Sequence, residues 1–167
     1  MQQDGPPSRS TQNDSLTRQS MVQFDDYDGP DNPPEGWRLY RSSSPFTQQI
    51  GRMYQHWDKE QKIFRRGFRI RKAHCNTRGK VHGGMLMTFI DSVMGMTLWL
   101  SEERQGVTAQ MNTEFLSNAD PGDWIEAEAH VDRCTKTLAF LKIRVHAGGK
   151  LVLTASGLFS LRERKEK

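Results

Sequence analysis

A long apolar run at residues 83–103 limits the fold of this chain more than any other feature of the sequence. Apolar side chains recur on nearly every side of a helix drawn through these residues, so the helix has no broad polar face to turn toward water. Gly106 follows the run and predicts where the helix ends. A helix of this composition must be buried on most sides, which requires another part of the chain to wrap around it.

Alternating apolar residues on both sides of this helix predict strands. Four long segments follow it, at 107–116, 124–134, 137–146 and 151–161. Gly148-Gly149 predicts a hairpin between the last two segments, and Pro121-Gly122 predicts another turn. Before the long helix, we expect a short helix at 44–51, a short strand at 53–57, and a strand at 63–73 with a solvated edge because of its arginines.

The order of these elements is strand, strand, helix and then a meander of four strands. One curved antiparallel sheet that wraps one long central helix buries the apolar faces of both with few elements. The sequence therefore predicts an α+β fold.

The first 36 residues differ in composition from the rest of the chain. They contain seven acidic residues, two arginines and few apolar side chains, which gives a net charge of −5. Such a segment cannot bury enough surface to offset its ordering entropy, so we predict a disordered acidic tail at 1–36 and one folded domain at 37–167. Because the whole chain carries +4, the domain carries +9, which favours an anionic partner.

The cysteine and histidine content favours a cytoplasmic protein without a metal site. Cys75 and Cys134 are too few for a disulfide framework or a cysteine-rich zinc site. The five histidines show no zinc spacing, and the pair His74-Cys75 has no second pair to complete it. We expect no membrane span, because the apolar stretch at 85–100 is short and interrupted by polar residues.

Two glycines, Gly83 and Gly84, open the central helix. No Ser, Thr, Asp or Asn directly precedes them, so the first N–H groups of the helix lack an obvious local partner. Free amide hydrogens at the start of a helix favour a carbonyl oxygen that is becoming negative. From the glycine pair alone, a simple turn of the chain into its helix is the favoured explanation, and a binding site is the alternative.

Asp91 lies in the middle of the apolar helix, where a carboxylate is costly without a partner. Either an arginine from a strand or a backbone end pairs with it, or it serves as a general base or nucleophile. Gly83 and Asp91 are separated by roughly 12 Å of helix rise, which is too far for both to act on one carbon atom. Two antiparallel copies of the helix would bring Gly83 of one subunit near Asp91 of the other, so we predict a homodimer with two shared sites.

Six residues with fixed spacing resemble the motif of the hotdog-fold acyl-CoA thioesterases of the phenylacetate-pathway type, in the thioesterase superfamily: Asn76, Gly79, His82, Gly83, Gly84 and Asp91. The likeness covers residues 45–161 and includes the segments 106–111, 115–123 and 136–140. It implies a hotdog fold, dimers or tetramers, and hydrolysis of an acyl-CoA to a free acid and CoA. CoA is then part of the substrate, and no cofactor is expected.

The resemblance also implies a role for each matching residue. Asp91 would activate water as a base or act as the nucleophile, and the N–H of Gly83 would polarise the thioester carbonyl with help from Asn76. Thr108 would orient the water, although it carries a methyl group that serine lacks, and His82 would add a supporting hydrogen bond. Four residues are expected near CoA: Ser117, Asn118, Lys136 and Thr137.

Other functions stay open on the sequence alone. A hotdog module that binds acyl-CoA without hydrolysing it would act as a sensor or regulator, although the intact acid favours an enzyme. The basic run at 65–72 is either a site for CoA phosphates or a solvated face. Nucleic-acid binding would need aromatic residues among the basic ones or a helix-turn-helix pattern, so we predict no nucleic-acid partner.

Overall fold

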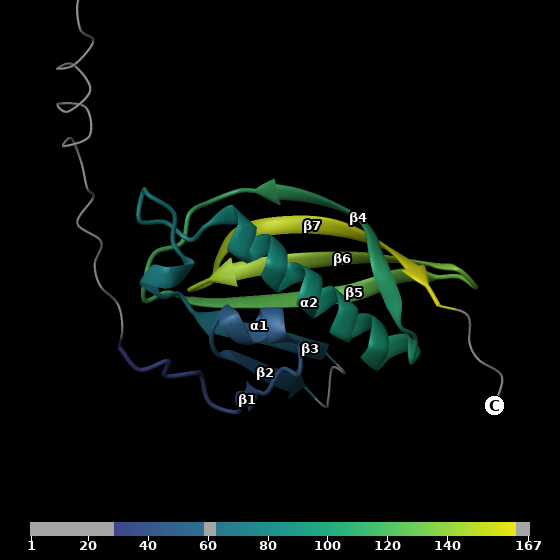
Figure 1. The fold of residues 1–167 in the computed structure, drawn as a ribbon, viewed down its shortest axis with the longest axis horizontal. Helices are drawn as coiled ribbons and strands as arrows, with labels where there is room; N and C mark the ends of the chain where they lie inside the picture. The colour runs from purple at the N-terminus through teal and green to yellow at the C-terminus, as the bar shows by residue number, and fades with distance from the viewer. Residues whose placement is uncertain (1–28, 59–62, 163–167) are drawn as a thin grey trace, which may run out of the picture.

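The computed structural model describes residues 29–58 and 63–162 (Figure 1). Within them, seven strands form one antiparallel sheet: β1 (Arg38–Tyr40), β2 (Met53–Asp58), β3 (Ile63–Arg69), β4 (Gly106–Phe115), β5 (Trp124–Cys134), β6 (Leu138–Ala147) and β7 (Lys150–Leu161). The helices are α1 (Pro45–Gln49), a 3-10 turn at Lys72–His74, and α2 (Gly83–Glu102). Figure 1 shows α2 lying across one face of the curved sheet, which confirms the predicted α+β fold.

The long helix α2 is the core element that the sequence predicts. Its buried residues recur at helical spacing and face the sheet: Leu86, Phe89, Ile90, Val93, Met94, Thr97 and Leu98. Glu103, in a left-handed conformation with φ of 52°, ends the helix, and Gly106 instead begins β4. By length and composition alone α2 could cross a membrane, which differs from our expectation that the apolar stretch at 85–100 is too short. In this structure, however, α2 packs against the sheet as a core helix.

The predicted meander of four strands is wrong in one respect. The strands β5, β6 and β7 do follow one another as neighbours, but β4 pairs with β7 at the far edge of the sheet. This order arises because the chain leaves α2 beside the end of β7, where Gly106 pairs with Leu161. The Pro121-Gly122 turn therefore belongs to a crossover from β4 to β5, and β4 has a free backbone edge in the described part of the chain.

The prediction that the strand at 63–73 has a solvated edge is also wrong. This strand, β3, ends at Arg69 and lies inside the sheet between β2 and β5. Its arginines mostly contact protein groups. Arg65 pairs with Glu128 at 2.8 Å, and Arg66 is buried.

The predicted tail has an ordered end. Residues 1–28 lie outside the described residues, but residues 29–36 pack against the sheet. The guanidinium of Arg69 donates to the backbone carbonyls of Asp31 and Asn32 at 2.8 and 2.7 Å, and that of Arg71 donates to the carbonyl of Gly29 at 3.0 Å. The arginines of β3 and the turn after it therefore hold a segment that we had assigned to the tail.

Asp31 anchors this segment in the protein. Its carboxylate is 4% exposed, lies 2.6 Å from Arg71 Nη2 and 3.5 Å from an Arg52 nitrogen, and accepts the Tyr54 hydroxyl at 2.8 Å. Burial raises the pKa of Asp31, but the hydrogen bonds from Arg71 and Tyr54 and the two arginine charges outweigh it. The net result is a pKa below the ordinary value of 3.8.

We predict that Asp31→Asn lowers the free energy of unfolding by about 3 kcal/mol at neutral pH, since it removes the carboxylate that pairs with the partly buried Arg71. Because the folded-state pKa of Asp31 is lowered, its contribution is complete above the unfolded pKa and is lost as the pH falls through the folded one. Urea unfolding at several pH values measures this. A difference between variant and wild type that persists unchanged into strong acid would contradict the assignment.

Candidate active site

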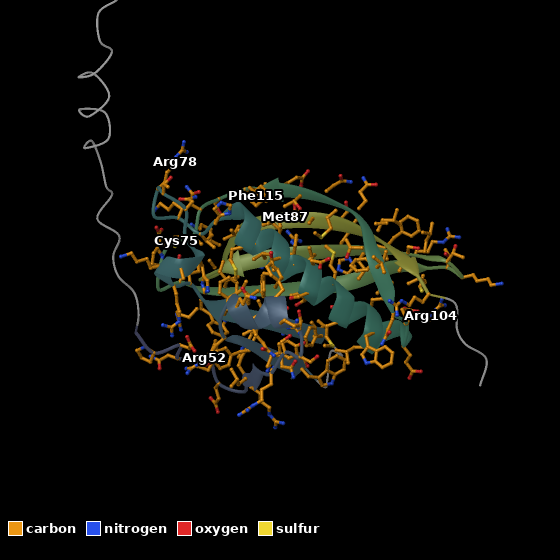
Figure 2. All side chains as sticks on the ribbon, viewed as in Figure 1. Arg52, Cys75, Arg78, Met87, Arg104 and Phe115 are labelled. Atoms are coloured by element: carbon orange, nitrogen blue, oxygen red, sulfur yellow. The ribbon has the colours of Figure 1, made fainter. Side chains whose placement is uncertain are left out.

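One stripe of α2 faces the free edge strand β4. Gly83, Met87 and Asp91 are spaced four residues apart and so lie on one side of the helix. Each has a neighbour on β4, with Phe115 beside Gly83, Thr113 beside Met87 and Thr108 beside Asp91. Figure 2 shows Met87 and Phe115 at the end of the molecule where α2 begins and β4 ends. Both helix residues expected at the site are therefore turned toward the edge of the sheet.

The start of α2 is capped, which corrects the expectation that its first N–H groups lack a local partner. His82 Nδ1 accepts the N–H of Gly84 at 2.8 Å, so the neutral ring carries its proton on Nε2. The N–H of Gly83 has no hydrogen-bond partner in the described part of the chain. The His82 side chain thus caps the helix through Gly84 and leaves the Gly83 N–H open to a ligand.

Asn76 is held in the loop before α2. Its side-chain oxygen accepts the N–H groups of Arg78 at 2.9 Å and Lys80 at 3.3 Å. These two bonds fix the orientation of the amide and leave its NH2 group without a partner among the described residues. Asn76 is therefore available as a donor, but no contact joins it to Gly83 or Asp91 within one chain.

Asp91 is half-buried, and its partner is Thr108. The Thr108 hydroxyl donates to Asp91 Oδ1 at 2.5 Å. No described cation pairs with this carboxylate. The nearby guanidinium of Arg66 donates instead to the carbonyl and hydroxyl oxygens of Ser92, both at 3.2 Å. Within residues 29–58 and 63–162 of one chain, therefore, no arginine neutralises Asp91. Together with Thr108 it lines a cavity of about 460 Å³.

A β-bulge turns Thr108 toward Asp91. The register between β4 and β7 shifts between Thr108 and Gln110, so Ala109 is the extra residue. Met111 and Thr113 are partly buried on the helix side of β4, and unbroken alternation would place Thr108 on the opposite face. The period-two pattern of the sequence does not reveal this change of face.

The four residues expected near CoA lie at two ends of the molecule. Ser117 donates its hydroxyl to the Leu151 carbonyl, and the Asn118 carbonyl accepts from Lys150, both near the start of β7. The carbonyls of Lys136 and Thr137 bond to Arg104 and Leu161 near the other end of β6. Because β6 is 10 residues long, about 30 Å separates the pairs, and one chain does not bring them together.

His74 has a structural role. Its ring is buried, with Nδ1 accepting the Arg71 N–H at 3.0 Å and Nε2 lying 2.9 Å from the Ile50 carbonyl. Burial lowers the pKa of His74, which favours the neutral ring. Residues 29–58 and 63–162 contain no group of three or more His, Cys, Asp or Glu side chains that would hold a metal ion.

Known proteins share both the sequence and the fold. The family model described as "Thioesterase superfamily" matches residues 78–154. A Pseudomonas aeruginosa protein, whose name assigns it provisionally to the esterases, is 35% identical over 132 residues, which are 78% of this chain and 98% of that protein. Human acyl-coenzyme A thioesterase 13 is 36% identical over 87 residues, or 50% of this chain and 62% of the human protein. The crystal structure of thioesterase superfamily member 2 from Mus musculus has a TM-score of 0.64 and 27% identity, and covers 70% of this chain and 87% of that one.

A long helix wrapped by one curved antiparallel sheet, with a carboxylate turned toward the edge strand, defines a hotdog thioesterase domain. The match to the Pseudomonas protein covers nearly the whole length of that protein, so it is not confined to the motif between Asn76 and Asp91. The chain belongs to the thioesterase superfamily, a family of thioester hydrolases. The resemblance seen in the sequence is thereby confirmed.

Proposed function

We propose that this protein is an acyl-CoA thioesterase that hydrolyses its substrate to a free acid and CoA. The observation that carries the proposal is the Asp91 carboxylate, which no described cation neutralises and which accepts the Thr108 hydroxyl in the wall of a cavity. In the simplest mechanism Asp91 takes a proton from water while the water oxygen bonds to the thioester carbon. The carbon–sulfur bond then breaks and CoA leaves as the thiolate. Direct attack by Asp91 would instead form an anhydride that water later opens, and both routes use the same residue.

The donors in this mechanism come from the start of the helix. The amide N–H of Gly83 and the free NH2 group of Asn76 would stabilise the carbonyl oxygen as it becomes negative. Thr108 would hold the carboxylate or the water in position. Thiolate is a good leaving group, so the proposed chemistry requires neither a metal nor a cofactor.

Each site requires two chains in this proposal. Gly83 and Asp91 of one helix are roughly 12 Å apart along its axis. The edge strand β4 has free backbone groups and two large exposed apolar side chains, Val107 at 58% and Phe115 at 55%. If two copies of β4 pair in antiparallel fashion, the two helices lie side by side and Gly83 of each chain approaches Asp91 of the other. The same pairing brings the Ser117–Asn118 end of one chain toward the Lys136–Thr137 end of its partner, as a shared CoA site requires.

A screen of acyl-CoA substrates tests the proposed activity. Purified protein is mixed with acyl-CoAs of different length and polarity, and the release of free thiol is followed with a chromogenic reagent. We expect turnover of at least one substrate well above the uncatalysed rate. Binding of acyl-CoA without thiol release would instead favour the alternative of a sensor or regulator.

We keep a cytoplasmic location as part of the proposal.

The role of Thr108 leads to a separate prediction. Thr108→Val keeps the shape of the side chain but removes its hydroxyl, so we expect kcat to fall on the order of 10- to 100-fold with little change in KM. Thr108→Ser should retain most activity. Thr113→Val on the same strand is the matched control, because Thr113 contacts Met87 rather than Asp91. Equal losses in Thr108→Val and Thr113→Val would show that the hydroxyl next to Asp91 has no special role.

A further inference from the structure

Arg66 is a buried cation whose charge is only partly compensated. The side chain lies on β3 and is 1% exposed. Its Nη1 donates to Ser92, but Nε and Nη2 have no hydrogen-bond partner within the described residues. No described carboxylate pairs with it, and burial lowers the pKa of the guanidinium by more than the adjacent Tyr40 raises it. Apolar side chains of similar volume are often at least as stable as a buried cation, so packing alone does not require an arginine here.

Two aromatic rings lie near the guanidinium, and Nε and Nη2 at its edge have no hydrogen-bond partner among the described residues. The Tyr40 ring lies 3.9 Å and the Phe64 ring 5.4 Å from its central carbon, at cation–π distances. A carboxylate binds arginine in the plane of the guanidinium, through two parallel N–H···O bonds. Stacking against Tyr40 is therefore compatible with an anion at Nε and Nη2.

Arg66 lines the same cavity of about 460 Å³ as Asp91 and Thr108. Several residues with hydroxyl groups also line this cavity: Tyr40, Ser42, Ser43, Ser44 and Thr47. The oxygens of Ser42 and Ser44 accept backbone N–H groups, so their hydroxyl hydrogens remain available to a ligand. Among the described residues that line this cavity, Asp91 is the one acidic residue. A molecule that reacts at Asp91 would thus extend toward an unpaired cation and a set of hydroxyl donors.

We propose that Arg66 selects acyl groups with a carboxylate at the far end, so that the substrates are CoA thioesters of dicarboxylic acids. The carboxylate would accept two hydrogen bonds from Nε and Nη2 of Arg66 and further ones from the serine hydroxyls. Both nitrogens are closed off from water in the free chain, so a small displacement of the cavity wall must admit the ligand. This inference rests on the proposed thioesterase function and adds the class of substrate.

Matched pairs of substrates test the inference. Each pair has one chain length and ends in either a carboxylate or a methyl group: glutaryl- and pentanoyl-CoA, adipyl- and hexanoyl-CoA, and suberyl- and octanoyl-CoA. We expect wild-type kcat/KM to favour the carboxylate-ended member of at least one pair by tenfold or more. In Arg66→Met that member should lose at least tenfold, while its methyl-ended analogue changes less than threefold.

Two further variants control for charge and folding. Arg65→Met removes the same charge from the neighbouring position, which faces the other side of β3 and pairs with Glu128, and should leave the preference unchanged. Arg66→Lys keeps the charge but loses the planar fork, so an intermediate preference is expected even if Arg66→Met folds poorly. Thermal unfolding should show Arg66→Met to be as stable as wild type or more so.

Some outcomes would overturn the inference. They are a wild type that favours the methyl-ended member of every pair, and an Arg66→Met variant that loses activity equally on both members while remaining folded. The absence of hydrolysis of any acyl-CoA by the wild type is a different result, because it refutes the proposed function itself.

Discussion

Asp91→Asn should lower kcat by about 1,000-fold or more while the protein stays folded, as expected when a general base or nucleophile is removed. The substitution keeps the shape of the side chain, and its amide oxygen can still accept the Thr108 hydroxyl. KM should change little, because the lost interaction belongs to the chemical step. Thiol release under saturating acyl-CoA measures the effect, with circular dichroism to confirm folding.

The matched control for this variant is Asp132→Asn. Asp132 is an exposed carboxylate on β5 whose neighbours are His130 and Lys142, and it lies outside the cavity of Asp91. Its replacement removes one negative charge and should leave kcat within about twofold. If Asp91→Asn retains activity comparable to this control, the carboxylate is not the reactive group and the proposed mechanism fails.

A mixture of two inactive variants should recover activity if each site is shared between chains. Gly83→Pro removes the amide hydrogen at the first position of α2, where proline suits a helix, and His82 already has the extended conformation that precedes proline. Alone, this variant should lose about 100- to 1,000-fold in kcat. Gly83→Ala adds the same Cβ against the Phe115 ring but keeps the N–H, so it separates crowding from the loss of the donor.

Refolding Gly83→Pro with Asp91→Asn in equal amounts should restore roughly a quarter of wild-type activity, since half of the dimers are mixed and each mixed dimer has one intact site. Neither variant refolded alone should recover. Sedimentation of the wild type and mixture should show dimers or larger assemblies. Activity that never rises above that of the separate variants, or a fully active monomer, would place each site within one chain.

The main elements of the fold follow from patterns in the sequence. The helix α2 was predictable because its residues are apolar on nearly all sides, and β5, β6 and β7 because their apolar residues alternate over ten or more positions. The start of α1 was predictable from Ser44 and Pro45, since serine is a favoured cap and proline a favoured first residue. These signals are local, and tertiary packing reinforces them.

Features that depend on distant parts of the chain were not predictable. The strand β1 has three residues, too few to show a period. The place of β4 at the sheet edge depends on where α2 delivers the chain. The bulge at Ala109 adds one residue against β7, and nothing in the local pattern marks it. The resemblance pointed to Gly83, Asp91 and Thr108, which lie where α2 faces β4, but the capping bond of His82 required coordinates.

The contacts that hold Asp31 and its neighbours against the sheet have a practical consequence for protein production. A shortened version that begins at residue 37, where composition changes, would lack the carboxylate and carbonyls that bind Arg69 and Arg71. Arg71 and Arg52 would then lose the carboxylate that pairs with them, and Arg69 would lose two of its three backbone acceptors. A truncation that begins at residue 29 would retain every one of these contacts, and is the better choice for crystallisation.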